Sequence, residues 1–311
     1  MPALDYSLTV LTQVLIMAIL TAIGFFVTKA GKFSKKTAED MTFVVFKIAT
    51  PAVIMKSFIE VDFTADYLAM IAMAALLALI SHLLGLAAGL VFLRMKHCEN
   101  AAVYRFGCLI SNAGFIALPL AQATLDAESV LLVSVYVIVL NIFTWTIGKA
   151  YFEPGGKLGI MNILINPGTL GVMGGLVMLI IKLFGMPELI SDTVNAVAAI
   201  NAPMAMMITG YYLVGTDIRA ALRDGRLWLV LAFRHILLPV AAMLLYRYAF
   251  GIGTQLLCAA IIPLCAPCAV IVIMMAASTG GDQKTACRMA SVSTILSVVT
   301  MPLVLTLCMM L

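Results

Sequence analysis

Two apolar stretches of the chain carry residues that could form a binding site. The first contains Asn112 within a Ser-Asn-Ala-Gly run and then Pro119, and the second contains Pro263 and Pro267. Proline removes a backbone donor and clashes with the preceding turn, so we expect a helix to break in each stretch. The freed carbonyl groups and the partial charges at the half-helix ends would then serve as ligand groups. A tolerated kink is the alternative, because proline and glycine are ordinary in membrane helices.

Several polar side chains lie near the middle of apolar runs, where their burial is costly. Arg234 lies about eight residues into its run, near the midplane for a rise of ~1.5 Å per residue. Its guanidinium suits a carboxylate, and snorkelling or a fixed carbonyl partner is the alternative. His82 is a proton contact, a substrate contact or a packing residue. Asn141 reaches a cavity or bonds a neighbouring helix. The candidate substrate contacts are Ser111, Asn112, Gly114, Asn141, Arg234, Pro263 and Pro267, with His82 as a further proton or substrate contact.

The sequence offers little support for catalysis or for a metal site. No Asp or Glu falls at the middle of an apolar run, so a proton relay through a buried carboxylate is unsupported. No nucleotide-binding loop, H-E-x-x-H motif or convincing serine triad is present, and an intramembrane hydrolase that uses His82 is only a formal alternative. Cys265 and Cys268 match a C-x-x-C spacing without a βαβ context, which favours packing. We predict no enzyme activity, metal or cofactor, and coupling to Na⁺ or H⁺ stays open.

The composition places this chain in a lipid bilayer. Of 311 residues, 63% are hydrophobic and 11% are charged, whereas soluble domains are about 45–50% apolar and about 25% charged. The apolar runs are roughly 18–25 residues long, the length of a helix that crosses a ~30 Å hydrocarbon core. The net charge of +4 is not gathered in a basic stripe, which argues against a nucleic-acid partner. The fold class is therefore an all-α polytopic membrane protein.

We expect ten transmembrane helices, over residues 6–28, 41–58, 67–93, 101–125, 130–150, 164–184, 190–214, 227–250, 256–278 and 286–310. Most of the 19 Lys and Arg residues fall in the odd-numbered connections, such as Lys29 to Lys36 and Arg219 to Arg226. By the positive-inside rule these connections are cytoplasmic. Both termini are then extracytoplasmic in a multi-pass protein of the cell (cytoplasmic or inner) membrane.

The two halves of the chain show a weak internal repeat. A shift that places Pro51 on Pro203 also places His82 on Arg234 and Ser111 on Pro263, without a gap. With five spans per half, the second half must enter the membrane from the opposite side, as in many secondary transporters. The predicted units are a first five-helix repeat over 1–151, a short cytoplasmic connection over 152–162 and an inverted repeat over 163–311. Helix breaks are expected at Pro51, Pro119 and Pro203.

Four features, in this order, resemble the auxin efflux carrier family. They are Ser111-Asn-Ala-Gly-Phe-Ile-Ala-Leu-Pro-Leu120, the Asn166-Pro-Gly that opens span six, the Pro203 span ending in Gly210, and Ser293-Thr-Ile-Leu-Ser-Val-Val-Thr-Met-Pro302. The resemblance covers essentially the whole chain. It implies a 5+5 fold with crossed, broken fourth and ninth helices, similar to bile-acid sodium symporters.

The chain departs from the plant members of that family in two places. Plant auxin exporters place a proline directly after the span-four asparagine, where this chain has Ala113, and often carry a long central loop that is short here. The chain thus resembles a bacterial malonate or malate permease. We expect a secondary active transporter that carries small organic anions, such as mono- or dicarboxylates, by alternating access. An auxin-like aromatic carboxylate exporter and an anion channel are the alternatives. The exact substrate, the direction and the formation of a homodimer stay open.

Overall fold

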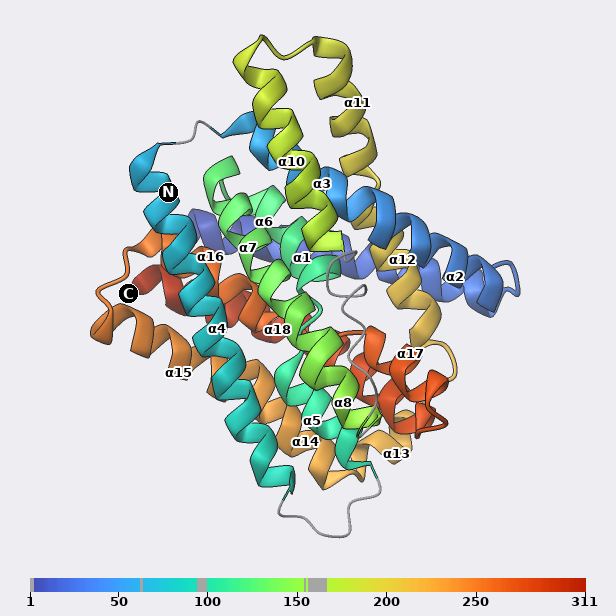
Figure 1. Cartoon of the computed structure of the whole chain (residues 1–311). Helices are drawn as coiled ribbons and strands as arrows, with labels where there is room; N and C mark the ends of the chain where they lie inside the picture. Colours follow the sequence, from blue (N-terminus) through green and yellow to red (C-terminus); the bar gives the residue numbers. More distant parts are fainter. Residues whose placement is uncertain (1–2, 62–63, 94–99, 154, 156–166) are drawn as a thin grey trace.

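The computed structural model describes residues 3–61, 64–93, 100–153, 155 and 167–311. Regular structure in these residues is helical, apart from one isolated β-bridge (Figure 1). The first half contains α1 (Ala3–Lys29), α2 (Lys35–Val44), η1 (Val45–Ala49), α3 (Thr50–Glu60), α4 (Ala65–Leu93), α5 (Ala101–Leu109), η2 (Ala113–Ala117), α6 (Leu118–Thr124), α7 (Ala127–Phe143), η3 (Thr144–Gly148) and α8 (Lys149–Phe152).

The second half contains a corresponding series of helices. They are α10 (Pro167–Leu183), α11 (Glu188–Ala199), α12 (Asn201–Leu213), α13 (Ile218–Leu222), α14 (Gly225–Ala232), η4 (Phe233–Leu237), α15 (Leu238–Leu244), η5 (Leu245–Ala249), α16 (Thr254–Cys265), α17 (Ile271–Ser278) and α18 (Gln283–Met310). The elements labelled η are single π-helical turns within longer helices.

The membrane segments confirm the all-α polytopic class. Within the described residues, seven helices are long and apolar enough to cross a membrane. They are Leu8–Lys29, Lys35–Glu60, Asp66–Leu90, Ala127–Phe152, Glu188–Leu213, Gly225–Ala249 and Gln283–Met310. The fourth, sixth and ninth expected spans contain shorter apolar helices, Ala113–Thr124, Pro167–Leu183 and Thr254–Cys265. Asn166 and most of the expected 152–162 connection lie outside the described residues.

The second span begins earlier than its apolar run suggests. Its helix starts at Lys35, after Ser34, whose hydroxyl oxygen accepts a hydrogen bond of 3.2 Å from the Thr37 backbone N–H. The first turns contain Lys35, Lys36 and Glu39, so they add no hydropathy although they are helical. A serine N-cap satisfies a backbone donor that the helix itself leaves free.

The three prolines at which we expected helix breaks lie in the first turns of helices. Pro51 and Pro119 lie in the first turns of α3 and α6, directly after π-helical turns, and Pro203 lies in the first turn of α12. The first turn of a helix tolerates proline because its N–H groups have no partner within the helix, which accounts for Pro203. The spans that contain Pro51 and Pro119 instead continue through the π-helical turns, whose last hydrogen bonds come from Thr50 and Leu118, the residues just before the two prolines.

The helix pairs are reciprocal between the two halves. The first helix of each half packs on the second span of the other half, α1 on α12 and α10 on α3. Gly24 and Gly210 permit the first contact, because a Cβ at either position would overlap backbone atoms of the partner helix. At Gly171 and Gly175 an added Cβ would instead meet the side chains of Ile54 and Phe58. This exchange agrees with an inverted repeat.

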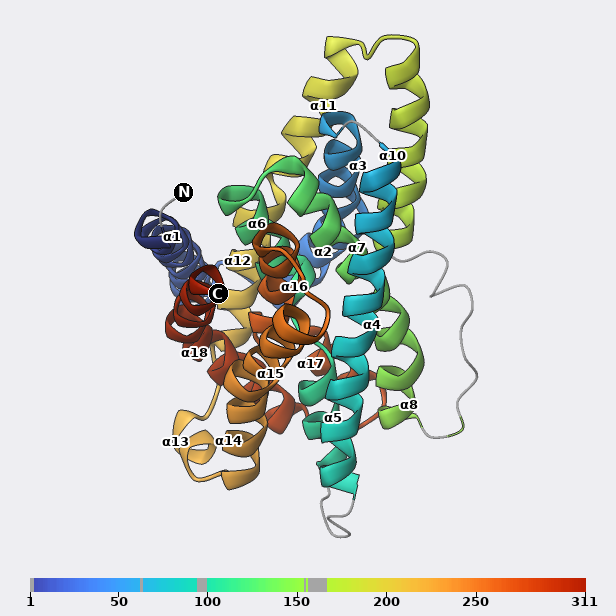
Figure 2. The ribbon, with the colours of Figure 1, turned by 90° about the vertical axis from the view of Figure 1, so that its left-hand side faces the viewer.

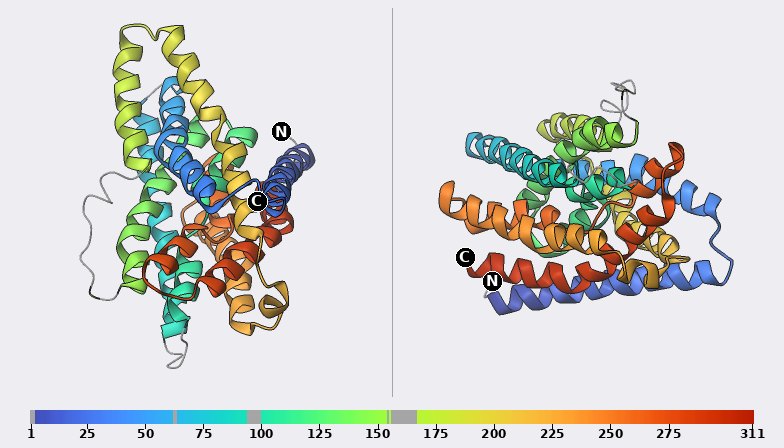
Figure 3. Two further views of the ribbon diagram at one scale, coloured as in Figure 1. Left: turned by 90° about the vertical axis from the view of Figure 1, so that its right-hand side faces the viewer. Right: turned by 90° about the horizontal axis from the view of Figure 1, so that it is seen from below.

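The remaining helices surround the crossing of the two broken spans. Helix α4 packs on α5 and α16, α7 packs on α16, and α18 packs on α16 and α17. Helices α1 and α18 run antiparallel in contact, so the ends of the described chain lie close together (Figures 2 and 3). The turn between α10 and α11 lies at the top of Figure 1, whereas α13 lies at the lower right.

Candidate functional site

The two broken helices cross and hydrogen-bond to each other at their breaks. Ser111 and Cys268 form an antiparallel β-bridge. The Asn112 N–H donates to the Pro267 carbonyl oxygen at 2.7 Å, and the Ala269 N–H donates to the Ile110 carbonyl oxygen at 3.2 Å. The expected crossing of broken fourth and ninth helices is therefore confirmed.

The second break lies later in the chain than the repeat register predicts. The gap-free shift places Ser111 on Pro263, but Pro263 lies inside α16 and Ser111 faces Cys268. Helix α16 ends at Cys265, and Ala266, just before Pro267, has an extended backbone. A residue that precedes proline is disfavoured in the helical conformation, so Pro267 sets the end of α16. The repeat thus carries an offset at its break.

A small pocket receives the N-terminal ends of both half-helices. It has a volume of about 40 Å³ and is lined at one end by Asn112, Gly114 and Phe115, and at the other by Val270 and Ile271. The first N–H groups of a helix have no partner within that helix, and they carry its partial positive charge. Two positive ends therefore meet in one buried space.

Four of the seven expected substrate contacts line this pocket: Ser111, Asn112, Gly114 and Asn141. The Asn112 Nδ2 is buried without a hydrogen-bond partner, whereas the Ser111 side chain interacts with the Tyr136 hydroxyl and the Asn141 Nδ2 donates to the Val137 carbonyl oxygen at 2.8 Å. Buried polar groups in folded proteins are almost always paired. The unpaired amide of Asn112 therefore points to a ligand that accepts hydrogen bonds.

Two threonines, which the sequence did not single out as contacts, complete the polar wall of the pocket. Thr144 donates to the Leu140 carbonyl oxygen at 2.7 Å, and Thr50 donates to the Asn201 Oδ1 at 3.0 Å. Thr50 directly precedes Pro51, which was the available signal for a polar group beside a distorted turn. Thr144 carries no such signal in the sequence.

Arg234 lies at a different end of the broken helices. Its side chain is fully buried, and it does not line the pocket. The Nε donates to the Ala266 carbonyl oxygen at 3.3 Å, and the Nη2 donates to the Pro263 carbonyl oxygen at 3.4 Å. These carbonyls form the C-terminal end of α16. The geometry thus favours the fixed carbonyl partner over the direct substrate contact.

His82, which the repeat register pairs with Arg234, is packed among aromatic rings. Its ring stacks on Phe143 at 4.7 Å and lies 5.0 Å from the Tyr136 ring. The Nδ1 pairs with the Ala78 carbonyl oxygen at 2.7 Å, and the Nε2 is buried without a partner. Neither His82 nor the two prolines Pro263 and Pro267 line the pocket. A proton-transfer role for His82 stays a prediction.

A hydrogen-bonded network fixes the second break to its neighbours. The Ser293 Oγ accepts a hydrogen bond from the Cys268 N–H at 2.8 Å and pairs with the His235 Nε2 at 2.8 Å. The His235 Nδ1 pairs with the Thr300 Oγ1 at 2.9 Å. The sequence does not predict this network, because it joins two residues of α18 to His235 and to the Cys268 backbone, which lie elsewhere in the chain.

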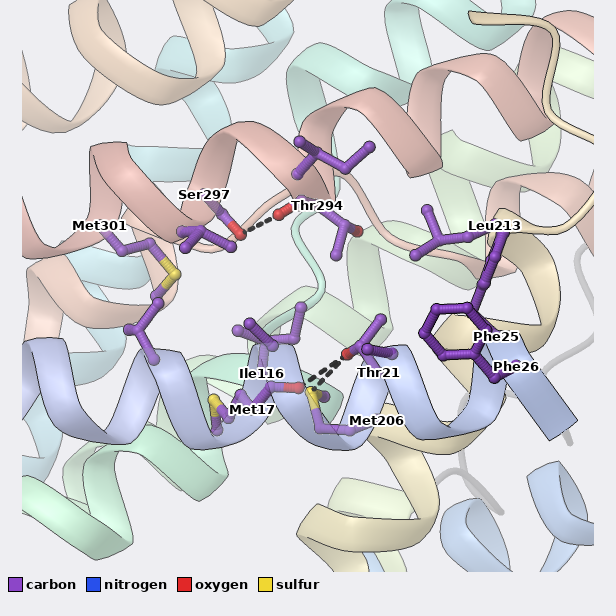
Figure 4. A pocket seen from close by; sticks show the side chains of 15 residues that line it. Met17, Thr21, Phe25, Phe26, Ile116, Met206, Leu213, Thr294, Ser297 and Met301 are labelled. Atoms are coloured by element: carbon purple, nitrogen blue, oxygen red, sulfur yellow. Dashed lines mark hydrogen bonds between the residues drawn. The ribbon is translucent and has the colours of Figure 1, made fainter.

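A second, apolar cavity lies between α1, α12 and α18. It has a volume of about 300 Å³, and Figure 4 shows its side chains, among which Thr21, Thr294 and Ser297 carry hydroxyl groups. Thr21 donates to the Met17 carbonyl oxygen, Thr294 to that of Ala290 and Ser297 to that of Thr294. Since each hydroxyl is already bonded to the backbone, this cavity is a poor site for a charged solute.

A wider cavity of about 620 Å³ opens beside the crossing. It is lined by Lys35, Glu39 and Tyr212 on one side and by Met274 of α17 and Gln283 of α18 on the other. Helix α17 also contributes Ile271 to the small pocket. The two cavities therefore lie along one helix. Within the described residues, no cluster of three or more His, Cys, Asp or Glu side chains could hold a metal ion.

Comparisons with known families match the two halves of the chain to two different families. Residues 9–163 match the family described as membrane transport protein, and residues 196–311 match the sodium bile acid symporter family. A search of curated proteins finds no match to this chain. The first match includes the break at Asn112 and the second includes the break at Cys268. Both matched families are families of membrane transporters, so the chain is a membrane transporter, and the two matches are consistent with the resemblance to the auxin efflux carrier family.

Proposed function

We propose that the chain is a secondary transporter of small organic anions, and that a mono- or dicarboxylate such as malonate or malate binds in the small pocket at the crossing. The observation that carries this proposal is the unpaired Asn112 amide beside two half-helix N-terminal ends. Helix N-termini favour anions because their N–H groups and their partial charge of about +0.5 both face the ligand.

The balance of polar groups in the pocket supports an anion over a cation. Removing a carboxylate from water is costly unless donors replace its hydration shell. The N–H groups at Gly114 and Ile271, the Asn112 amide and the Ser111 hydroxyl can supply those donors. No carboxylate lines the pocket among the described residues. A cation would find no counter-charge among these lining residues.

The size of the pocket supports a short substrate. A pocket needs a volume of roughly 10–15 Å³ to hold one water molecule. This pocket, of about 40 Å³, therefore has room for about one carboxylate group. An aromatic ring does not fit in this conformation. The pocket therefore accommodates one carboxylate group of a substrate, and this favours short carboxylates over an auxin-like aromatic carboxylate, which is the main alternative.

The cavity beside the crossing supports alternating access. Its walls come from α2 and α12 on one side and from α17 and α18 on the other. We propose that the bundle of spans three to five and eight to ten moves against spans one, two, six and seven. The cavity adjoins the ends of α1 and α2, where Lys29 to Lys36 mark the expected cytoplasmic side. In this proposal the structure is the inward-facing state of a protein in the cell membrane.

Uptake into proteoliposomes tests the substrate class. Labelled acetate, malonate, malate and indole-3-acetate are offered beside a neutral and a cationic solute, with and without sodium and pH gradients. Saturable uptake and counterflow of short carboxylates are expected. Uptake restricted to neutral or cationic solutes would contradict the anion site. Flux that stays linear in the gradient at unitary-current rates would identify an anion channel.

Site-directed labelling tests the orientation. Cysteines placed at Glu128 and at Gln283 in a cysteine-free background are treated with a membrane-impermeant maleimide on intact cells. The proposed orientation predicts labelling at the first position and protection at the second. The reverse pattern would overturn the cytoplasmic assignment of the odd-numbered connections.

A further inference from the structure

The C-terminal end of α16 carries carbonyl groups that the helix cannot satisfy. The last carbonyls of a helix have no partner within it and carry its partial negative charge. Helix α16 stops at Cys265, and Pro267 has no N–H to offer. The carbonyl oxygens of Pro263 and Ala266 therefore need a hydrogen-bond donor from outside α16.

The Arg234 guanidinium occupies this position. It donates to both carbonyl oxygens, at 3.4 Å to Pro263 and 3.3 Å to Ala266, and its side chain is fully buried. The buried polar residues of the described chain include no Asp or Glu. The ion pairs found there, Lys35–Glu39, Lys56–Glu60 and Lys149–Glu153, do not involve Arg234. The end of a helix, and not a carboxylate, thus faces this buried charge.

The surroundings of Arg234 are buried. The Tyr136 hydroxyl of α7 hydrogen-bonds with Arg234, and Tyr136 and His82 of α4 are themselves buried. Half-helix C-terminal ends and unwound carbonyls are the groups that coordinate Na⁺ in transporters with broken helices. A mobile cation at the same carbonyls would be repelled by the fixed guanidinium, since like charges at contact distance interact strongly in a medium of low dielectric constant.

We propose that Arg234 is a built-in replacement for a coupling cation: transport by this protein does not require sodium, and removal of the guanidinium opens the α16 carbonyls to a small monovalent cation. This inference rests on the proposed anion transport. The site assigned here takes a monovalent cation such as Na⁺ or a free guanidinium compound, and only in the absence of the Arg234 side chain.

Thermal unfolding of the purified full-length protein tests the cation site without transport. Wild type and Arg234→Ala are compared in sodium, potassium and millimolar methylguanidinium at equal ionic strength. Arg247→Ala is the matched control, because the Arg247 Nη1 also donates to a backbone carbonyl, that of Ile252 at 3.0 Å, in the turn before α16. We expect that neither the Tm of wild type nor the Tm of the control changes between the salts. The Tm of Arg234→Ala is lower and rises saturably with sodium or methylguanidinium.

Uptake in the same salts gives the functional readout. Wild type takes up its carboxylate equally in sodium and potassium, and Arg234→Ala regains uptake with sodium or methylguanidinium. Sodium-dependent uptake by wild type, or an Arg234→Ala protein whose Tm ignores every cation, would overturn the inference. Arg234→Lys retains a charge and is expected to stay independent of sodium, which provides a test if the alanine variant does not fold.

The two proposals fail in different ways. Carboxylate uptake that needs sodium in wild type overturns the role of Arg234 and leaves the anion site intact. A wild-type protein that takes up no carboxylate, combined with the expected Tm pattern, overturns the substrate class and leaves the cation replacement intact.

Discussion

The two ends of the broken helices are treated differently by this chain. At the N-terminal ends, the pocket beside Asn112 and Gly114 contains donors without partners. At the C-terminal end of α16, the carbonyls of Pro263 and Ala266 are bonded by Arg234. A break in a membrane helix creates both partial charges together. The protein satisfies the negative end of α16 with Arg234 and leaves the Asn112 amide beside the positive ends unpaired, as expected of a carrier for anions.

The largest effect is expected when a bulky side chain fills the pocket beside Asn112. A Cβ at Gly114 would meet no atom within 4 Å, although Gly114 lines the pocket. Gly114→Val should therefore fold normally and abolish carboxylate uptake, because its methyl groups occupy the space of the anion. Gly225→Val is the matched control, since a Cβ at Gly225 also meets nothing and lies away from the pocket. Unchanged uptake by Gly114→Val, with the Tm of wild type, would place the substrate elsewhere.

The next largest effect is expected when the Arg234 guanidinium is removed from the C-terminal end of α16. Arg234→Gln removes two hydrogen bonds from a charged donor, each worth about 1.5–3 kcal/mol, so we expect the protein to lose about 3 kcal/mol of stability. The carboxylate affinity should change less than in Asn112→Ala, because Arg234 does not line the pocket. Denaturant unfolding and equilibrium binding measure the two quantities. A large loss of affinity with normal stability would show that Arg234 contacts the substrate after all.

A smaller effect is expected when the Asn112 amide is removed and the pocket is left open. Asn112→Ala removes a hydrogen bond to a charged ligand and should weaken carboxylate binding by about 1–3 kcal/mol. Stability should not fall, because the Asn112 Nδ2 has no partner in the empty pocket. Binding isothermal calorimetry checks the affinity. Asn100→Ala, an amide at the start of α5 that bonds Thr285, serves as control. Equal affinities in the two variants would remove Asn112 from the site.

The smallest effect is expected when the hydrogen-bonded network around Ser293 is broken. Ser293→Ala leaves the Cys268 N–H without its acceptor and breaks the contact with His235. Loss of a buried partner costs about 1–3 kcal/mol, and we expect the lower end because Cys268 lies beside an irregular segment. Stability should fall by about 1 kcal/mol with little change in affinity. A change in carboxylate affinity larger than that of Asn112→Ala would show that the network shapes the pocket directly.

Much of the fold could be predicted from the sequence, because lipid leaves few alternatives. Long apolar runs must be helical in a membrane, and the runs with Asn112 and with Pro267 showed where helices stop. The start of the second span at Lys35 was missed because its first turns are charged. The register of the second break was wrong because Pro263 fits inside α16, whereas Pro267 ends it.

The site was predictable only in part, for a physical reason. Asn112 and Gly114 lie within the break itself, so the local sequence identifies them. The partner of Arg234 depends on where another helix ends, which is 29 residues away along the chain at Pro263. No residue type marks a backbone carbonyl as free. The contacts of His235 and Ser293 were missed likewise, because they lie between helices.

A structure with a bound carboxylate tests the central comparison most directly. The purified protein is determined by electron cryomicroscopy at saturating malonate, with Gly114→Val under the same conditions as reference. We predict density for a carboxylate within hydrogen-bond distance of the Asn112 Nδ2 and the N–H groups at Gly114 and Ile271, and no such density in the variant. Arg234 should still donate to the Pro263 and Ala266 carbonyls. Density for malonate against Arg234, or in the apolar cavity of Figure 4, would contradict the account.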